Sequence, residues 1–326
     1  MKYIIFILFI CIIILLKYMK FGDRASVLGY IVRKLLFYTN YLFADYINKL
    51  NRKYRKGNDE NWKVKEKKFG KYIIKNITIN KVKAGLIVPK KQKSKKIILQ
   101  LHGGGYELGL PYNNLHFAKK YSKVLKDFSV LTINYRVAPK YKYPAALEDS
   151  VEAYKYILKQ GYSNEDIIIV GDSAGGGLAI ATVMYLRDNN IKLPKAIITM
   201  SAWTDLTNKE ESFSKNYKID PIFGVSNKTI VFTSRYAEGM DKKTPYISPI
   251  YGDFKDFPSM LMQVGTNEML ISDTLEIVKK AKNNNVDVTV GIYKGMFHIF
   301  QSFKGILFES DLAWKQVREF VKKLYD

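Results

Sequence analysis

A serine flanked by glycines at a fixed spacing is the first feature of this chain that could do chemistry. Gly171-Asp-Ser173-Ala-Gly175 fits the pattern G-x-S-x-G, in which a sharp turn from strand to helix exposes the serine hydroxyl. Four apolar residues precede the segment and an apolar, small-residue helix pattern follows it, which is the context that the pattern requires. A glycine-rich turn with a chance serine is the alternative. The context favours a nucleophile at Ser173, with the Ala174 N–H directed at a developing oxyanion.

The base that such a serine needs can be chosen by elimination. A serine hydroxyl is a poor nucleophile unless a base accepts its proton and a third group orients that base. The chain has three histidines, His102, His116 and His298. Behind a turn of this kind, the acid and then the histidine follow the serine along the chain. His298 is the one histidine after Ser173, and the sequence therefore predicts it as the base.

Two carboxylates compete for the role of orienting that base. Glu268 is the first acidic residue after the predicted strand 260–264, where its side chain can still face the site. Asp273 comes about one helical turn later, and we expect it to face solvent or to cap a helix locally. Glu268 is therefore the preferred acid, and Asp273 stays open as the alternative.

A run of glycines after another predicted strand supplies candidate hydrogen-bond donors. His102-Gly-Gly-Gly follows the apolar residues 97–101. Glycines at this point let successive backbone N–H groups turn into a cavity unhindered by side chains. We expect Gly103, Gly104 and Gly105 to border an oxyanion hole together with Ala174. His102 itself is expected to orient the loop by hydrogen bonding.

The composition excludes several classes of function. The formal net charge of +23, from 53 basic and 30 acidic side chains, could serve a nucleic acid or an anionic membrane surface. No nucleic-acid-binding motif accompanies the lysines, so we expect no nucleic-acid partner and favour a solvated basic face, turned toward lipid head groups. A single cysteine, Cys11, excludes a disulfide and a thiolate metal site within one chain. No Walker or dinucleotide fingerprint is present, and no cofactor or metal is predicted.

Predicted strands and helices alternate through most of the chain. This alternation predicts an α/β fold with a mostly parallel sheet and helices on both faces. The predicted strands are residues 72–79, 82–88, 97–101, 128–134, 167–170, 196–200, 260–264 and 286–293, and the clearest helices are 145–158, 270–281 and the C-terminal segment. We expect residues 61–326 to form this domain.

The N-terminal residues have a different character. Residues 3–16 are almost uninterruptedly apolar, and Lys17 and Lys20 follow them. An uncleaved membrane anchor over residues 1–20 is favoured over a cleaved signal peptide, because no small-residue cleavage site follows directly. Residues 21–60 predict one or two amphipathic helices and a linker. These helices could pack on the core, cover a lipophilic pocket as a lid, or lie on a membrane.

Several motifs in consistent order now point to one family. They are His102-Gly-Gly-Gly-Tyr106, Asn134-Tyr-Arg-Val-Ala-Pro-Lys140, Tyr143-Pro-Ala-Ala-Leu-Glu-Asp149, Gly171-Asp-Ser-Ala-Gly-Gly176, Ser201-Ala-Trp-Thr-Asp-Leu206, Tyr246-Ile-Ser-Pro-Ile-Tyr251 and Gly295-Met-Phe-His298. The chain resembles the hormone-sensitive-lipase family of α/β-hydrolases, which includes bacterial carboxylesterases and membrane-anchored arylacetamide deacetylases. The match spans about residues 97–300. It departs from the family at Asn134 and Lys140, where two acids are usual.

The resemblance implies roles for the residues named above. Ser173 would be the nucleophile, Glu268 the acid and His298 the base of a cofactor-free hydrolase that acts on small-molecule or lipid esters. A cap would combine the N-terminal helices with an insertion at about 203–245. Basic residues after the anchor favour a cytoplasmic body, whereas anchored relatives can face the other side, so the side stays open. An amidase, a non-catalytic ligand receptor and a membrane-surface binding protein are the alternatives.

Overall fold

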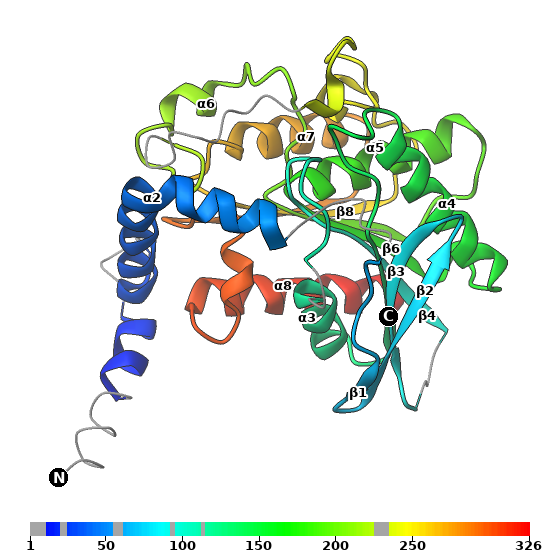
Figure 1. The fold of residues 1–326 in the computed structure, drawn as a ribbon, viewed down its shortest axis with the longest axis horizontal. Coiled ribbons are helices and arrows are strands. Elements are labelled where there is room, and N and C mark those ends of the chain that lie inside the picture. The colour runs from blue at the N-terminus through cyan, green and yellow to red at the C-terminus, as the bar shows by residue number, and fades with distance from the viewer. Residues whose placement is uncertain (1–10, 20–24, 55–60, 92–94, 112–114, 225–234) are drawn as a thin grey trace.

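One nine-stranded sheet runs through the centre of the molecule (Figure 1). The computed structural model describes residues 11–19, 25–54, 61–91, 95–111, 115–224 and 235–326. The strands lie in the order β1-β2-β3-β5-β4-β6-β7-β8-β9. Their bounds are β1 Lys67–Phe69, β2 Tyr72–Ile79, β3 Val82–Pro89, β4 Lys96–Leu101, β5 Phe128–Ile133, β6 Ile167–Asp172, β7 Ala196–Met200, β8 Ser259–Gly265 and β9 Val288–Tyr293. In this order, β1, β2, β3 and β5 pair antiparallel with their neighbours. The strands from β5 through β4, β6, β7 and β8 to β9 pair parallel.

Helices cover both faces of this sheet. One hydrophobic core joins α4, α5 and α7 to the sheet, and a second joins α3 and α8 to its opposite face (Figure 1). The bounds are α2 Val27–Tyr54, α3 His116–Val124, α4 Ala145–Lys159, α5 Ala174–Asp188, α6 Glu211–Lys215, α7 Ile271–Asn283 and α8 Phe308–Tyr325, with short 3₁₀ turns η1 Asn164–Asp166, η2 Arg235–Ala237, η3 Pro249–Tyr251 and η4 Phe300–Phe303. Because both faces are covered, the central strands are buried along their whole length and mostly apolar, as in β5 and β7, where every residue is buried.

The predicted α/β fold is confirmed in its mostly parallel sheet and its helices on both faces. The predicted strands agree with β2 to β9 within two residues at most ends. The sequence missed β1, a three-residue strand at the antiparallel edge, because its Lys-Lys-Phe sequence has too little apolar alternation.

The helix α2 lies beside the C-terminal part of the chain. It bends at Phe43, whose backbone angles are not helical (Figure 1). The sequence predicts one helix or two here, and the observed element is two helices joined at this bend. Leu28, Val32 and Leu36 pack on a small apolar cluster around Phe297. This contact is the core-packing role that the sequence left open. Other apolar side chains of α2 are exposed at the surface: Tyr30, Ile31, Leu35, Tyr38, Tyr41, Leu42, Phe43 and Tyr46.

The predicted anchor is described only in its second half. Residues 11–18 are helical, whereas residues 1–10 and 20 lie outside the described residues. Ile12, Ile13, Ile14 and Leu15 are exposed. Across the described ranges, no helix combines the length and the apolar character that crossing a membrane requires.

The close approach of α5 to β4 generates a stability prediction. A Cβ on Gly175 would lie 2.2 Å from the Leu101 carbonyl oxygen and 2.6 Å from the His102 carbonyl oxygen. Both are backbone atoms, which cannot rotate away as a side chain can. We expect Gly175→Ala to lower the free energy of unfolding by about 3 kcal/mol or more, because α5 must move off the sheet.

Urea unfolding of the purified protein measures this loss. Gly239→Ala is the matched control, since no atom lies within 4 Å of the added Cβ and the cost is confined to the positive φ of 82°. Equal losses in the two variants would contradict the packing argument.

Candidate active site

Ser173 occupies a strained turn between β6 and α5. Its φ is +54°, a left-handed conformation that a serine adopts only when the surroundings enforce it. A Cβ on Gly171 would lie 2.0 Å from the Gly175 carbonyl oxygen, so only glycine fits on the strand side of the turn. The Ser173 N–H donates to the Met200 carbonyl of β7 at 2.9 Å. The turn is therefore fixed to the adjacent strand, at the carboxyl edge of the parallel sheet.

Glu268 and His298 are brought into direct contact. The His298 Nδ1 lies 3.1 Å from Glu268 Oε2, and both side chains are buried. The other oxygen, Oε1, accepts hydrogen bonds from the Ser201 hydroxyl at 2.9 Å and the Gly265 N–H at 2.6 Å. With Nδ1–H donated to a carboxylate, the neutral imidazole carries its lone pair on Nε2, as a general base requires.

Ser201 connects this pair to the serine turn. It follows β7 directly and has a φ of +51°. Besides donating to Glu268, its hydroxyl accepts the N–H of Ile299 at 3.2 Å, the residue after the histidine. Its neighbour Met200 holds the Ser173 N–H. Ser201 thus contacts both Glu268 and the loop of His298. It follows β7, the strand that holds the Ser173 N–H.

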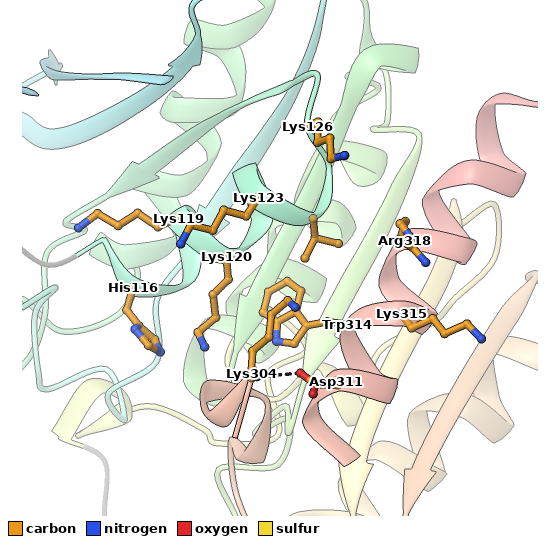
Figure 2. A pocket seen from close by; sticks show the side chains of 12 residues that line it. His116, Lys119, Lys120, Lys123, Lys126, Lys304, Asp311, Trp314, Lys315 and Arg318 are labelled. Carbon is orange, nitrogen blue, oxygen red and sulfur yellow. Dashed lines mark hydrogen bonds between the residues drawn. The ribbon is translucent and has the colours of Figure 1, made fainter. Parts of the chain in front are cut away.

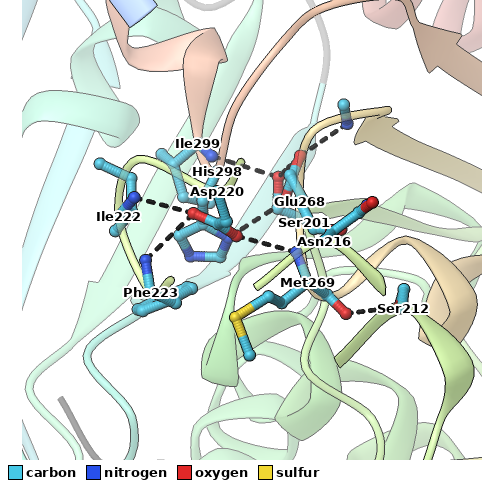
Figure 3. Close-up of polar contacts among 11 residues, drawn as sticks. Ser201, Ser212, Asn216, Asp220, Ile222, Phe223, Glu268, Met269, His298 and Ile299 are labelled. Carbon is cyan, nitrogen blue, oxygen red and sulfur yellow. Dashed lines mark hydrogen bonds and ion pairs between the residues drawn. The ribbon is translucent and has the colours of Figure 1, made fainter. Parts of the chain in front are cut away.

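Asp220 is a second buried carboxylate next to the imidazole. Figure 3 shows it beside His298, where its oxygens accept the N–H groups of Ile222, Phe223 and Met269 at 2.8–3.0 Å. Burial raises the pKa of Asp220, while the three N–H groups and the nearby imidazole oppose that rise. This residue is not among those that the sequence predicts for the site. Its Asp-Pro dipeptide signals a turn, but nothing in that signal indicates proximity to a histidine.

The glycine loop after β4 lies against the serine turn. A Cβ on Gly103 would lie 3.0 Å from the Ser173 Cβ, so the loop and the turn are immediate neighbours. The Gly103 N–H donates to the Asp172 carboxylate at 2.9 Å and thereby supports the loop. Gly104 and Gly105 have positive φ angles of 137° and 63°, which turn the backbone sharply. Ala174 is the first residue of α5, directly after the serine.

The three histidines take different places. His102 is buried, its Nδ1 contacts the Gly103 carbonyl at 2.9 Å, and its ring stacks on Tyr135 at 4.1 Å. These contacts suit the expectation that His102 orients the glycine loop. His116 begins α3 on another face of the molecule, where its Nε2 contacts the Ser302 carbonyl at 3.2 Å. Among the three, His298 is the histidine that contacts a carboxylate.

The expectation that Asp273 faces solvent is wrong. Asp273 is fully buried, and its Oδ2 accepts the N–H groups of Thr204 at 2.7 Å and Asp205 at 2.9 Å. It therefore caps a neighbouring loop instead of the helix that carries it. Desolvation raises its pKa to about 8, outweighing these two hydrogen bonds. Its Oδ1 has no partner among the described residues, as suits a neutral carboxyl group.

Residues of the predicted insertion 203–245 contact the histidine and the acid. The ring of Phe223 lies 4.4 Å from that of His298, and the Asn216 side chain donates to the Glu268 carbonyl at 2.8 Å. From α2, Asn40 donates to the Pro221 carbonyl at 2.6 Å. The N-terminal helix and the insertion thus meet above the site. Residues 225–234 of the insertion lie outside the described residues.

The two departures from the family pattern lie in a supporting loop. Asn134 is buried and its side-chain oxygen accepts the Leu110 N–H at 2.8 Å, whereas Lys140 is exposed.

Over the described ranges, no group of three or more His, Cys, Asp or Glu side chains is arranged to hold a metal ion.

Comparison with known proteins gives consistent results. Residues 98–302 match a family model described as alpha/beta hydrolase fold. An acetyl-hydrolase of Streptomyces hygroscopicus is 32% identical over 249 residues, which are 76% of this chain and 81% of that protein. An esterase of Acinetobacter venetianus is 31% identical over 230 residues, 70% of this chain and 75% of that protein.

Solved structures agree with these relatives. An esterase from the bacterial hormone-sensitive lipase family is 32% identical with a TM-score of 0.71, and the alignment covers 79% of this chain and 86% of that one. A structure of the protein EstE5, soaked with p-nitrophenyl butyrate, is 30% identical with a TM-score of 0.79, over 92% of this chain and 99% of that one.

The raised pKa of Asp273 generates a prediction on pH and stability. The carboxyl titrates near 3.8 when unfolded and at about 8 when folded, so the folded state holds the proton more tightly. The contribution of Asp273 to the free energy of unfolding is therefore fully present below about pH 4. It falls as the pH rises toward 8, by up to about 1.4 kcal/mol per pH unit. Asp273→Asn cannot ionise, and its stability relative to the wild type should increase over this range.

Urea unfolding at a series of pH values tests this. Asp256→Asn, which removes an exposed carboxylate, serves as the control for the loss of charge. Parallel pH profiles for Asp273→Asn and the wild type would contradict a neutral buried carboxyl.

Proposed function

Because this chain belongs to the hormone-sensitive-lipase family of α/β-hydrolases and is a carboxylic ester hydrolase, we propose that it cleaves esters of small to medium acyl groups through Ser173, His298 and Glu268. The observation that carries the proposal is the 3.1 Å contact between His298 Nδ1 and the buried Glu268 carboxylate, next to the strained serine turn. The contact suits a base that is held in one tautomer and orientation.

In the first half of the proposed reaction, His298 Nε2 takes the Ser173 proton as Oγ attacks the ester carbonyl. Glu268 stabilises the imidazolium that forms, and the buried Asp220 side chain lies beside the ring. The N–H groups of Gly104, Gly105 and Ala174 donate to the oxyanion of the tetrahedral intermediate. The imidazolium then protonates the leaving alcohol, and an acyl-serine remains.

In the second half, water replaces the alcohol and the same groups act again. His298 removes a proton from the water as its oxygen attacks the acyl-serine carbonyl, and the oxyanion forms in the same hole. Collapse of this intermediate returns the proton to Ser173 and releases the carboxylic acid. The balance is one ester and one water to one acid and one alcohol, with no oxidant, reductant or cofactor required.

The acyl size rests on the relatives and on the cap. One relative is named an acetyl-hydrolase, and the EstE5 structure was soaked with p-nitrophenyl butyrate. Phe223 packs on the imidazole, which places an aromatic side chain of the cap against the reacting groups. These observations favour short acyl chains over long ones.

The proposed nucleophile can be tested by removing its hydroxyl. Ser173→Ala should lower kcat/KM for p-nitrophenyl esters by at least about 10³-fold, because the acyl-enzyme cannot form. A series from acetate to decanoate, assayed with the wild type, should show the highest kcat/KM among the short esters.

Ser214→Ala is the matched control, since Ser214 is exposed on α6 and should leave kcat/KM unchanged. Undiminished hydrolysis by Ser173→Ala would overturn the assignment of the nucleophile. Turnover of acetanilides with none of esters would shift the function to amide hydrolysis.

The proposal extends to residues 1–20 as a membrane anchor. The apolar run of residues 3–16 supports it, as do the exposed side chains of Ile12, Ile13, Ile14 and Leu15 in the described part. An apolar helix end that leaves its side chains uncovered by the rest of the chain suits burial in lipid.

Fractionation of expressing cells tests the anchor. We expect the full chain in the membrane fraction, resistant to high salt and released by detergent. Phe9→Lys combined with Ile13→Lys should move most of it to the supernatant, because a lysine at the centre of a span costs about 3 kcal/mol. Phe9→Leu with Ile13→Leu is the control, and an unchanged distribution of the lysine variant would contradict the anchor.

A further inference from the structure

A strongly basic pocket lies between α3 and α8, on the face of the sheet opposite α4, α5 and α7 (Figure 2). Its volume is about 880 Å³. The cationic side chains that line it are Lys119, Lys120, Lys123, Lys126, Lys304, Lys315 and Arg318, and Val124 and Trp314 add apolar surface. None of these residues belongs to the proposed catalytic machinery.

The negative charge in this pocket is already neutralised. Asp311 is the acidic residue in its lining, and its Oδ2 accepts Lys17 Nζ at 2.6 Å while its Oδ1 accepts the Gly305 N–H at 2.7 Å. Lys315 pairs at 3.6 Å with Glu319, which is an exposed contact of little strength. Among the described residues, the lining therefore carries seven cationic side chains and one acidic side chain.

The lysines in the pocket raise one another's electrostatic energy. Lys120 is half-buried, and its Nζ donates to the Ser302 carbonyl at 2.7 Å. Burial, together with the charges of Lys304 and Lys123, lowers the pKa of Lys120 to about 8, against a smaller opposing effect of Asp311. These lysines line the same concavity, although their side chains point in different directions (Figure 2). An anion bound there would relieve their repulsion.

The pocket also lies where the N-terminal apolar helix meets the body of the protein. Lys17, in the helical residues 11–18, donates to the Gly305 carbonyl at 3.3 Å as well as to Asp311, and both of these residues line the pocket. The ring of Tyr18 contacts that of Phe308 at 5.5 Å. The exposed side chains of Ile12, Ile13, Ile14 and Leu15 continue from this point. Apolar side chains beside clustered lysines match a lipid surface with anionic head groups.

We propose that the pocket between α3 and α8 binds the phosphate groups of anionic phospholipids at a membrane surface. The lysines would contact the head-group phosphates, and the helix of residues 11–18 would enter the lipid at the rim of the pocket. The Trp314 ring is buried and packed against Tyr121, so nucleic-acid bases cannot stack on it, and His116 is the lining residue with an exposed ring. This favours a lipid head group over a single-stranded nucleic acid.

Vesicle flotation with the full chain tests the proposal. The probes are phosphatidylcholine vesicles and phosphatidylcholine vesicles with about one third phosphatidylglycerol, so that binding through the apolar N-terminus is common to both. We expect the wild type to bind the anionic vesicles at least about tenfold more tightly. Lys123→Glu with Lys304→Glu, one exposed lysine from each side of the pocket, should abolish this preference.

Two controls separate the pocket from net charge and from misfolding. Lys255→Glu with Lys279→Glu changes the net charge equally away from the pocket, and should keep the preference within about twofold. Both double variants should hydrolyse p-nitrophenyl acetate like the wild type, and Lys123→Gln with Lys304→Gln repeats the test if the first pair fails to fold. An equal loss in the control pair would overturn the proposal. So would tighter, pocket-dependent binding of a single-stranded RNA oligonucleotide than of vesicles.

Discussion

The absence of space for side chains where β6, α5 and β4 meet is the constraint on which the site depends. A Cβ on Gly171 or Gly175 would lie about 2 Å from a backbone carbonyl oxygen of the neighbouring segment. Helix α5 can therefore start directly on the sheet, and the chain must reverse within one residue. That residue is Ser173, whose positive φ follows from the packing around it. The hydroxyl stands at the carboxyl edge of the sheet because glycine on both sides lets the helix begin there.

The same kind of strain recurs wherever the site is assembled. Tyr106, Ser173, Ser201 and Ile299 all have φ angles between 51° and 60°, and each is, or lies next to in the chain or contacts, a residue to which we assign a role in the reaction. Such a conformation costs about 1–3 kcal/mol for a residue that is not glycine, so the surrounding contacts must over-determine it. The contacts are visible at Ser201, whose hydroxyl bonds both Glu268 and the N–H of Ile299. The acid and the histidine are thus held through one strained serine.

The sequence predicts what depends on local pattern and leaves open what depends on distant contacts. The parallel strands, the serine turn and the glycine loop each have a short signal, and the structure contains all three. Asp220 has no such signal, and the motif that begins at Ser201 does not indicate what its hydroxyl contacts, because both roles arise from contacts with residues 49 to 98 positions away. Asp273 was misjudged for the same reason: its partners, Thr204 and Asp205, belong to a loop that the helix pattern of its own segment does not include.

The segment that carries His298 also separates the reaction from the basic pocket. Phe297 and Phe300 are fully buried on either side of the histidine, and they anchor the segment before it reaches Lys304 at the pocket. Charge introduced at Lys304 is exposed to solvent, and water and salt therefore screen its effect on the imidazole. A buried aromatic pair resists displacement because moving it would open a cavity in the core. The two proposed sites can then share one short segment without either constraining the charge of the other.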